Sequence, residues 1–195
     1  MSLNNSIEAV IFDCDGVLAD TMPLHYEAYY RAFKEVGLTL EPDLFYRFSA
    51  GTAKETLKKL LVGRNYKGDW QQLHQRKKEL VLDLIDSDQL RPLASARLVP
   101  LLSPGYRLAV ASSGSTVSVH RIIHRLGLFN YFEEIVTGED VKAGKPDPEP
   151  FLLVASRMGI VPSKCLVIED SEDGLESAHR ANMQTMSVYS FIPQM

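Results

Sequence analysis

The sequence predicts an α/β fold in which a Rossmann-like parallel sheet carries helices on both faces and an all-helical cap domain is inserted after the first strand. Three observations lead to this prediction. Short apolar runs alternate with helical patterns in the second half of the chain, polar residues follow the apolar runs directly, and the segment after the first run contains helical patterns only. Alternation of strand and helix favours right-handed crossovers and a parallel sheet covered on both faces.

Five short apolar runs predict the strands of this sheet. Continuous apolar runs of this length are typical of strands that are buried on both faces. The runs are residues 7–12, 107–111, 134–137, 165–168 and 185–189.

Three helical patterns lie between the last four strands, at residues 116–126, 148–158 and 173–181. Gly127 and Gly159 follow the first two patterns, and Asn182 follows the third. Glycine and asparagine are common just past the last turn of a helix, so each pattern has the expected end. Because ligands of such sheets bind beyond the carboxyl ends of the strands, the loops that follow the strands are the candidate site.

The segment after the first strand begins with a pattern that predicts a helix. Thr21 is a candidate N-terminal cap, Pro23 falls in the first turn, and Gly37 is expected to end the helix. The apolar side of this helix is expected to consist of Tyr26, Tyr29, Tyr30, Phe33 and Val36. Two further helical patterns run over residues 52–61 and 69–85.

This arrangement predicts two domains. Residues 1–20 and 91–195 are expected to form the Rossmann-like catalytic core, and residues 21–90 to form the helical cap. Both ends of the insert are expected near the carboxyl end of the first strand, where a ligand would bind. The insert is therefore a candidate lid.

Composition limits the classes of partner. The chain has 195 residues with 21 Lys and Arg against 25 Asp and Glu, and this acidic balance gives no general reason to bind nucleic acid. Its two cysteines make neither a disulfide framework nor a four-ligand zinc site, which favours a reducing cytoplasm. No apolar run approaches the roughly 20 residues that span a bilayer, and the N-terminus does not resemble a secretory signal, so no membrane partner is expected.

Two carboxylates follow the first strand. Alternation along an extended chain places Asp13 and Asp15 on one side and turns Cys14 inward. Two neighbouring carboxylates do not both ionise readily without a cation. The alternative for an isolated D-x-D-G segment is an Asx turn with a capping aspartate.

Three other strand ends carry polar residues. Ser112, Ser113 and Gly114 open a helix, where hydroxyls and free N–H groups bind anions, although such residues are also ordinary caps. Lys145 lies in a proline-rich loop that could hold its ammonium group in place. The alternative interpretation is a solvated lysine in a turn. Glu169 and Asp170 follow the fourth strand, where the helix dipole explains one acid more readily than two. Together with Asp13 and Asp15, these two acids form an oxygen-rich set of the kind that Mg²⁺ binds.

Four segments occur in this order along the chain: FDCDGVLADT, VASSGS, KAGKPDPEPF and VIEDSEDG. They resemble the four motifs of the haloacid dehalogenase-like superfamily, and the resemblance covers the whole chain. The helical insert resembles the small cap of that family. EDSEDGLESAHRAN is most similar to the branch that contains β-phosphoglucomutase and small sugar-phosphate phosphatases.

The resemblance implies catalytic roles for the residues after the first strand. Asp13 would be the nucleophile that forms an aspartyl-phosphate, and Asp15 would protonate the leaving oxygen and later deprotonate the incoming hydroxyl. Members that cleave carbon–halogen or phosphonate bonds lack this second acid, so the Asp15 position favours phosphotransfer.

The resemblance also implies binding roles. Ser112 and the N–H groups of Ser113 and Gly114 would hold the phosphoryl group, and Lys145 would screen its charge from the nucleophile. Mg²⁺ would be bound by the Asp13 carboxylate, the Asp15 backbone carbonyl and Asp170, with Glu169 bound directly or through water.

These roles lead us to expect a Mg²⁺-dependent phosphatase for a small phosphorylated metabolite, such as a sugar phosphate. The alternative is a β-phosphoglucomutase-like phosphotransferase, because the resemblance places His25, Gly51, Lys54 and Lys77 at substrate positions of that mutase's cap. Lys54 stands roughly where the mutase has arginine, and an ammonium cannot reproduce bidentate phosphate binding. The alternative interpretation of Lys77 is a lysine on a solvated helix face. For the protein as a whole, a non-catalytic binding module on the same fold is a third possibility.

The C-terminal end of the chain bears on assembly. Members of this branch generally continue past the fifth strand with a further strand and helix, whereas this chain stops at Met195. We therefore expect a core that ends early. An exposed sheet edge at this position would invite self-association, although a monomer is the expected state.

Overall fold

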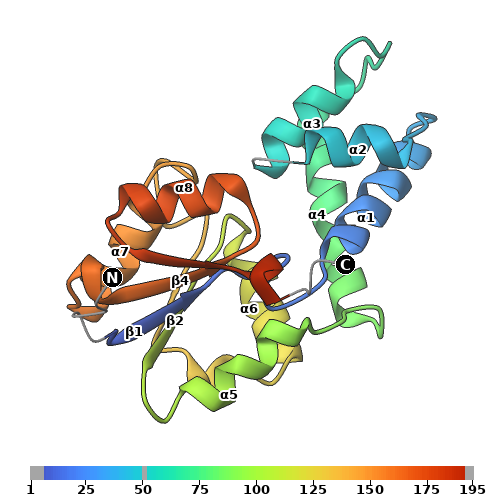
Figure 1. Cartoon of the computed structure of the whole chain (residues 1–195). Helices are drawn as coiled ribbons and strands as arrows, with labels where there is room; N and C mark the ends of the chain where they lie inside the picture. The colour runs from blue at the N-terminus through green and yellow to red at the C-terminus, as the bar shows by residue number, and fades with distance from the viewer. Residues whose placement is uncertain (1–6, 50–51, 192–195) are drawn as a thin grey trace. The chain divides into compact units, whose positions relative to one another are not determined.

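The computed structural model describes residues 7–49 and 52–191, and it divides the chain into two compact units (Figure 1). The first, here called the core unit, comprises the described residues up to Asp20 and from Pro92 onward. The second, here called the helical unit, comprises the described residues of Thr21–Arg91. That the helical unit acts as a cap stays a prediction.

The core unit is built on a five-stranded sheet in the order β3-β2-β1-β4-β5, with every neighbouring pair parallel. The strands are β1 (Ala9–Phe12), β2 (Arg107–Ala111), β3 (Glu134–Val136), β4 (Cys165–Glu169) and β5 (Gln184–Ser187). The predicted parallel α/β fold is confirmed. Its central strands are buried on both faces, which explains their continuous apolar runs.

The predicted fifth strand is wrong at its end. We expected a strand over residues 185–189, but Val188–Phe191 form a 3₁₀ turn. The last pair between β4 and β5 joins Glu169 to Ser187. The fourth strand ends at Glu169, so the chain beyond Ser187 has no strand to pair with.

Four helices cover the two faces of the sheet. Figure 1 shows α5 (Leu98–Leu102) and α6 (Thr116–Arg125) over one face, and α7 (Glu149–Met158) and α8 (Glu172–Arg180) over the other. On the second face, Phe151 of α7 and Ala178 of α8 belong to one buried cluster with Ile11, Ala109 and Val167 of the strands. The helix ends are as predicted, since Gly127, Gly159 and Asn182 all have positive φ angles.

The helical unit consists of α1 (Met22–Glu35), α2 (Pro42–Phe48), α3 (Ala53–Leu61) and α4 (Trp70–Asp86). α1 packs mainly against α4, and α3 contacts both α2 and α4. The longest of these helices, α4, has 17 residues. None of the helices in the described part of the chain has the length and apolar character needed to cross a membrane.

Two expectations for α1 are wrong. The Thr21 side chain makes no capping hydrogen bond, because its backbone already has helical angles at the cap position. Tyr30 and Val36 are exposed, at 37% and 41%. The buried side of α1 instead consists of Leu24, Ala28, Tyr29, Ala32 and Phe33. Small alanines therefore take the place on the buried side of α1 that we expected Tyr30 and Val36 to take.

Two further helices, α2 and α5, were not expected from the sequence. Both are short, with 7 and 5 residues, and short helices depend on tertiary packing more than on their own propensity. Pro42 starts α2, and Phe45 is buried beneath it. Pro100 falls in the first turn of α5, where its missing N–H group has no helical partner to lose.

Candidate active site

The sheet itself positions the candidate site residues. The N–H group of Asp13 donates to Ile168 O at 3.0 Å, so the ladder between β1 and β4 continues one residue past the first strand. The N–H group of Ser112 donates in the same way to Val136 O at 3.0 Å. Asp13 and Ser112 therefore begin at fixed backbone positions, side by side at the carboxyl edge of the sheet.

A buried lysine joins the carboxyl ends of three strands, β1, β2 and β4. The Lys145 Nζ atom donates to Asp13 Oδ1 at 2.6 Å, to Glu169 Oε1 at 2.5 Å and to Ala111 O at 3.0 Å. The three acceptors satisfy the three protons of the ammonium group. The Lys145 side chain is only 6% exposed, so the alternative of a solvated lysine is wrong.

Hydrogen bonds hold the loop that carries Lys145. The N–H group of Asp147 donates to Gly144 O at 3.0 Å, and its carboxylate accepts from the N–H group of Glu149 at 2.9 Å. Ser177 on α8 donates to Asp147 O at 2.6 Å. A turn, a helix cap and a contact with α8 therefore fix the loop that carries Lys145.

Glu169 is engaged at both of its carboxylate oxygens. Oε1 accepts from Lys145, and Oε2 accepts from the N–H groups of Asp170 at 2.8 Å and Ser171 at 2.9 Å and from the Ser171 hydroxyl at 3.0 Å. These bonds and the Lys145 ammonium lower the pKa of the Glu169 carboxyl, against the effect of burial. Glu169 thus anchors Lys145 in this structure, and its role as a metal ligand stays a prediction.

Three carboxylates lie close enough together to bind one cation. Asp13, Glu169 and Asp170 each offer an oxygen, and these oxygens lie within 4.8 Å of one another. Burial raises the pKa of Asp13 well above its usual range, although Lys145 opposes this shift. Burial and the neighbouring Glu169 raise the pKa of Asp170 to about 6. An all-oxygen donor set whose carboxylates are costly to ionise together fits a hard divalent cation such as Mg²⁺.

The Asp15 carboxylate contacts the serine loop that follows β2. The Ser112 hydroxyl donates to Asp15 Oδ2 at 3.3 Å and accepts from the N–H group of Gly114 at 3.0 Å. The prediction that Cys14 faces inward is confirmed, because its side chain is fully buried. Asp15 thus contacts the serine loop, and its charge adds to the effect of burial in raising the pKa of Asp13.

Glycines that the sequence analysis did not assign a role bring the loops of this edge together. A Cβ atom at Gly138 would lie 2.6 Å from Ser113 O, and one at Gly16 would overlap the Asp170 carboxylate. A Cβ atom at Gly174 would overlap the carboxylate of Glu169. The signal for Gly174 is present in the sequence, since a glycine in the first turn of a helix is a poor helix former and invites an explanation.

The expected substrate residues of the helical unit have different surroundings. The Lys77 Nζ atom lies 2.9 Å from His25 Nδ1 and 4.8 Å from the centroid of the Tyr29 ring. Lys77 is only 3% exposed, so a solvated helix face is the wrong description of it. The Lys54 Nζ atom lies 5.6 Å from the centroid of the Trp70 ring. Gly51 lies outside the described residues.

A parallel sheet with acids, a lysine and a serine loop at its carboxyl edge is typical of Rossmann-like α/β enzymes. The chain belongs to the haloacid dehalogenase-like hydrolase family, whose model matches residues 10–188. The expected class, a phosphomonoester hydrolase of this family, is confirmed, and so is the resemblance from which it was inferred.

Individual relatives carry more specific names. The chain is 37% identical over 182 residues to a phosphorylated carbohydrates phosphatase of Thermotoga maritima, covering 91% of this chain and 83% of that protein. It is 28% identical over 190 residues to a β-phosphoglucomutase of Bacillus subtilis, covering 93% and 83%. The crystal structure of CbbY from Rhodobacter sphaeroides in complex with phosphate superposes with a TM-score of 0.83 at 28% identity, covering 93% and 85%.

Proposed function

We propose that the chain is a Mg²⁺-dependent phosphatase that hydrolyses a small phosphorylated carbohydrate through an aspartyl-phosphate at Asp13. The observation that carries this proposal is the buried contact between Lys145 and the Asp13 carboxylate at the carboxyl edge of the sheet. The 37% identical phosphatase of Thermotoga maritima supports the substrate class. In this proposal the helical unit is the cap that selects the substrate.

Asp13 is the nucleophile of the proposed reaction. Lys145 holds Oδ1, which leaves Oδ2 as the oxygen that forms a bond to phosphorus while the bond from phosphorus to the substrate oxygen breaks. Asp15 donates its proton to the departing oxygen. In the second step Asp15 takes a proton from water, the water oxygen bonds to phosphorus, and the bond to Asp13 breaks to release inorganic phosphate.

The serine loop is the proposed phosphoryl-binding element. Ser112 offers its hydroxyl, and Ser113 and Gly114 offer backbone N–H groups in the loop just before the N-cap of α6. The N–H group of Gly114 bonds to the Ser112 hydroxyl in this structure, so it would exchange that bond for a phosphoryl oxygen. Lys145 contributes a fixed positive charge without having to reorganise during the reaction.

The proposed Mg²⁺ ligands are the Asp13 and Asp170 carboxylates and the Asp15 backbone carbonyl, with Glu169 acting directly or through water. The close grouping of the Asp13, Glu169 and Asp170 oxygens supports this assignment. When bound, the cation supplies positive charge that offsets the negative charge of the phosphoryl group and the nucleophile.

The proposal is tested by replacing Asp13 with asparagine. An amide oxygen is a far weaker nucleophile than a carboxylate, so Asp13→Asn should abolish hydrolysis of p-nitrophenyl phosphate. The matched control is Asp83→Asn, which makes the same change at an exposed position of α4 and should leave turnover unchanged. Excess EDTA should likewise suppress wild-type activity, and Mg²⁺ should restore it. Normal turnover by Asp13→Asn would exclude the aspartyl-phosphate.

A phosphoglucomutase-like activity is the second candidate. The contact between Lys77 and His25 favours it, because these are the positions that resemble the mutase's cap residues. The lysine at position 54 argues against it, because an ammonium binds phosphate through a point charge rather than a bidentate fork. β-Glucose 1-phosphate supplied with a trace of the bisphosphate would distinguish the two activities. Glucose 6-phosphate as the product indicates the mutase, and inorganic phosphate alone indicates the phosphatase.

A further inference from the structure

The Glu169 carboxylate lies directly against the first turn of α8, at Gly174. A Cβ atom at position 174 would overlap all three atoms of this carboxylate, of which the most distant, Oε2, would lie at 2.5 Å. Real Cβ atoms essentially never lie within 3.0 Å of a neighbour. Glu169 is 1% exposed and hydrogen-bonded at both oxygens, so it cannot move aside without losing these bonds.

Backbone geometry does not explain the glycine. Gly174 is not among the residues with positive φ, and it lies inside the regular helix α8. Alanine is a better helix former than glycine, so the helix alone would favour a substitution at this position. The structure therefore explains the glycine at position 174 by the space that the Glu169 carboxylate occupies.

A chain of contacts links Gly174 to the nucleophile. The N–H group of Gly174 donates to the Ser171 hydroxyl oxygen at 3.1 Å, and that hydroxyl donates to Glu169 Oε2 at 3.0 Å. Glu169 Oε1 accepts from Lys145, whose ammonium holds Asp13 Oδ1. A displacement of the Glu169 carboxylate would thus be transmitted through one ammonium group to Asp13.

We propose that Gly174 is a positioning residue. Because Gly174 has no side chain, the Glu169 carboxylate can lie against the first turn of α8. This carboxylate then holds Lys145 against Asp13, the proposed nucleophile. The catalytic part of this inference rests on the proposed function, whereas the contact between Gly174 and Glu169 does not.

The contact is tested by a double-mutant cycle in thermal unfolding, with EDTA present and no substrate. Gly174→Ala should lower the Tm in the wild-type background, although alanine favours the helix. In the Glu169→Ala background the overlap is gone, and the same substitution should raise the Tm. Gly105→Ala is the control, because a Cβ atom at Gly105 meets nothing within 4 Å. An equal change of Tm in the two backgrounds would overturn the inference.

The effect on Lys145 is tested by activity and by NMR. With an active wild type, Gly174→Ala should lower kcat about 100-fold, the effect of a misplacement of about 1 Å. Glu169→Asp shortens the acid by one methylene, so adding Gly174→Ala to that variant should cost much less. The Lys145 side-chain NMR signals should shift in Gly174→Ala and not in Gly105→Ala.

The outcomes separate the two proposals. An unchanged kcat, or an unchanged Lys145 signal, would reduce Gly174 to a packing position and overturn its positioning role. A wild type with no phosphatase activity would overturn the proposed function. In that case the unfolding cycle and the NMR shifts would still decide whether Gly174 positions Glu169 and Lys145.

Discussion

Replacing Lys145 with methionine should strongly destabilise the core unit, because two buried carboxylates would lose the cation that they share. The ammonium lies 2.6 Å from Asp13 Oδ1 and 2.5 Å from Glu169 Oε1, and the three side chains are 6%, 8% and 1% exposed. At an effective dielectric constant of about 20, each contact provides about 6 kcal/mol of Coulomb attraction. Lost hydration and repulsion between the carboxylates offset most of this attraction. Removing the ammonium should therefore lower the free energy of unfolding by about 3–5 kcal/mol.

The assay is thermal unfolding in the presence of EDTA. For a chain of this size a loss of about 3–5 kcal/mol corresponds to a fall in Tm of about 6–20 °C. Added Mg²⁺ should recover part of this loss, because a bound cation would again neutralise the carboxylates.

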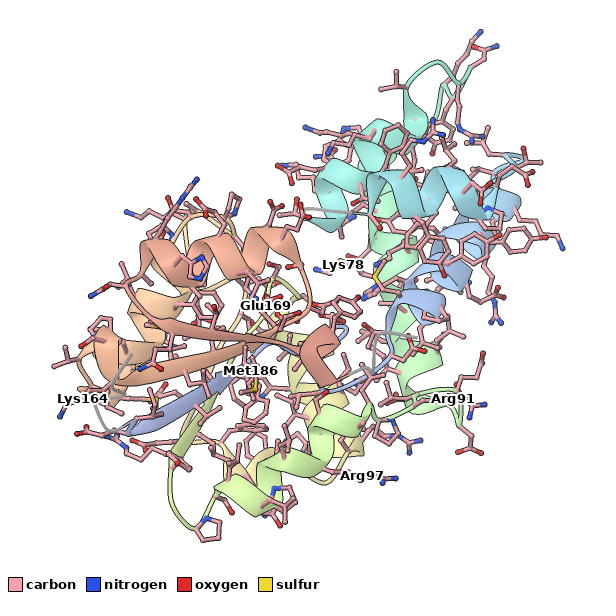
Figure 2. The ribbon with its side chains drawn as sticks, in the orientation of Figure 1. Lys78, Arg91, Arg97, Lys164, Glu169 and Met186 are labelled. Carbon is pink, nitrogen blue, oxygen red and sulfur yellow. The ribbon has the colours of Figure 1, made fainter. Side chains whose placement is uncertain are left out.

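The matched control is Lys164→Met. Lys164 and Glu169 flank β4 at its opposite ends (Figure 2). The Lys164 ammonium also pairs with a glutamate, at 2.5 Å from Glu8 Oε1, but the two side chains are 38% and 46% exposed. An exposed pair of this kind contributes about 0–1 kcal/mol. A fall in Tm for Lys145→Met no larger than that for Lys164→Met would refute the reasoning.

Two further substitutions test other contacts. Gly138→Ala places a Cβ atom 2.6 Å from Ser113 O and should cost about 1–3 kcal/mol and weaken competitive inhibition by inorganic phosphate. If inhibition by inorganic phosphate were unchanged in Gly138→Ala, Gly138 would not influence phosphate binding by the serine loop. Thr52→Ala removes a capping box with Glu55 and should cost about 1 kcal/mol in denaturant unfolding at neutral pH. The hydrogen bonds from Thr52 lower the pKa of Glu55, so the stabilisation is complete above the unfolded-state pKa. It should disappear as the pH falls through the lowered pKa, and a pH-independent difference would contradict this account.

The location of the site could be predicted from the sequence because the sheet is parallel. Asp13, Ser112 and Asp170 each directly follow a strand, and the carboxyl ends of parallel strands meet at one edge of the sheet. Periodicity thus determined which polar residues come together, without any knowledge of distance.

The partners within the site could not be predicted in the same way. The hydrogen bond from Ser112 to Asp15 joins two loops that are far apart in the sequence, and no residue pattern predicts it. The Lys145 loop carries no periodicity, so the sequence offers no means of telling a solvated ammonium from a buried one. Steric fit, as between Gly174 and Glu169, likewise depends on distances that a residue pattern does not contain.

The charges of the site give an electrostatic reason for the proposed cation. Three carboxylates, Asp13, Glu169 and Asp170, face one ammonium, Lys145, so the fully ionised cluster is negative before any substrate binds. A phosphate ester adds further negative charge to a mostly buried place, where unpaired charge is costly. Protonating Asp13 would relieve the repulsion but would also remove the proposed nucleophile. A divalent cation relieves the repulsion and leaves Asp13 ionised, and for this reason we expect activity and metal binding to be lost together.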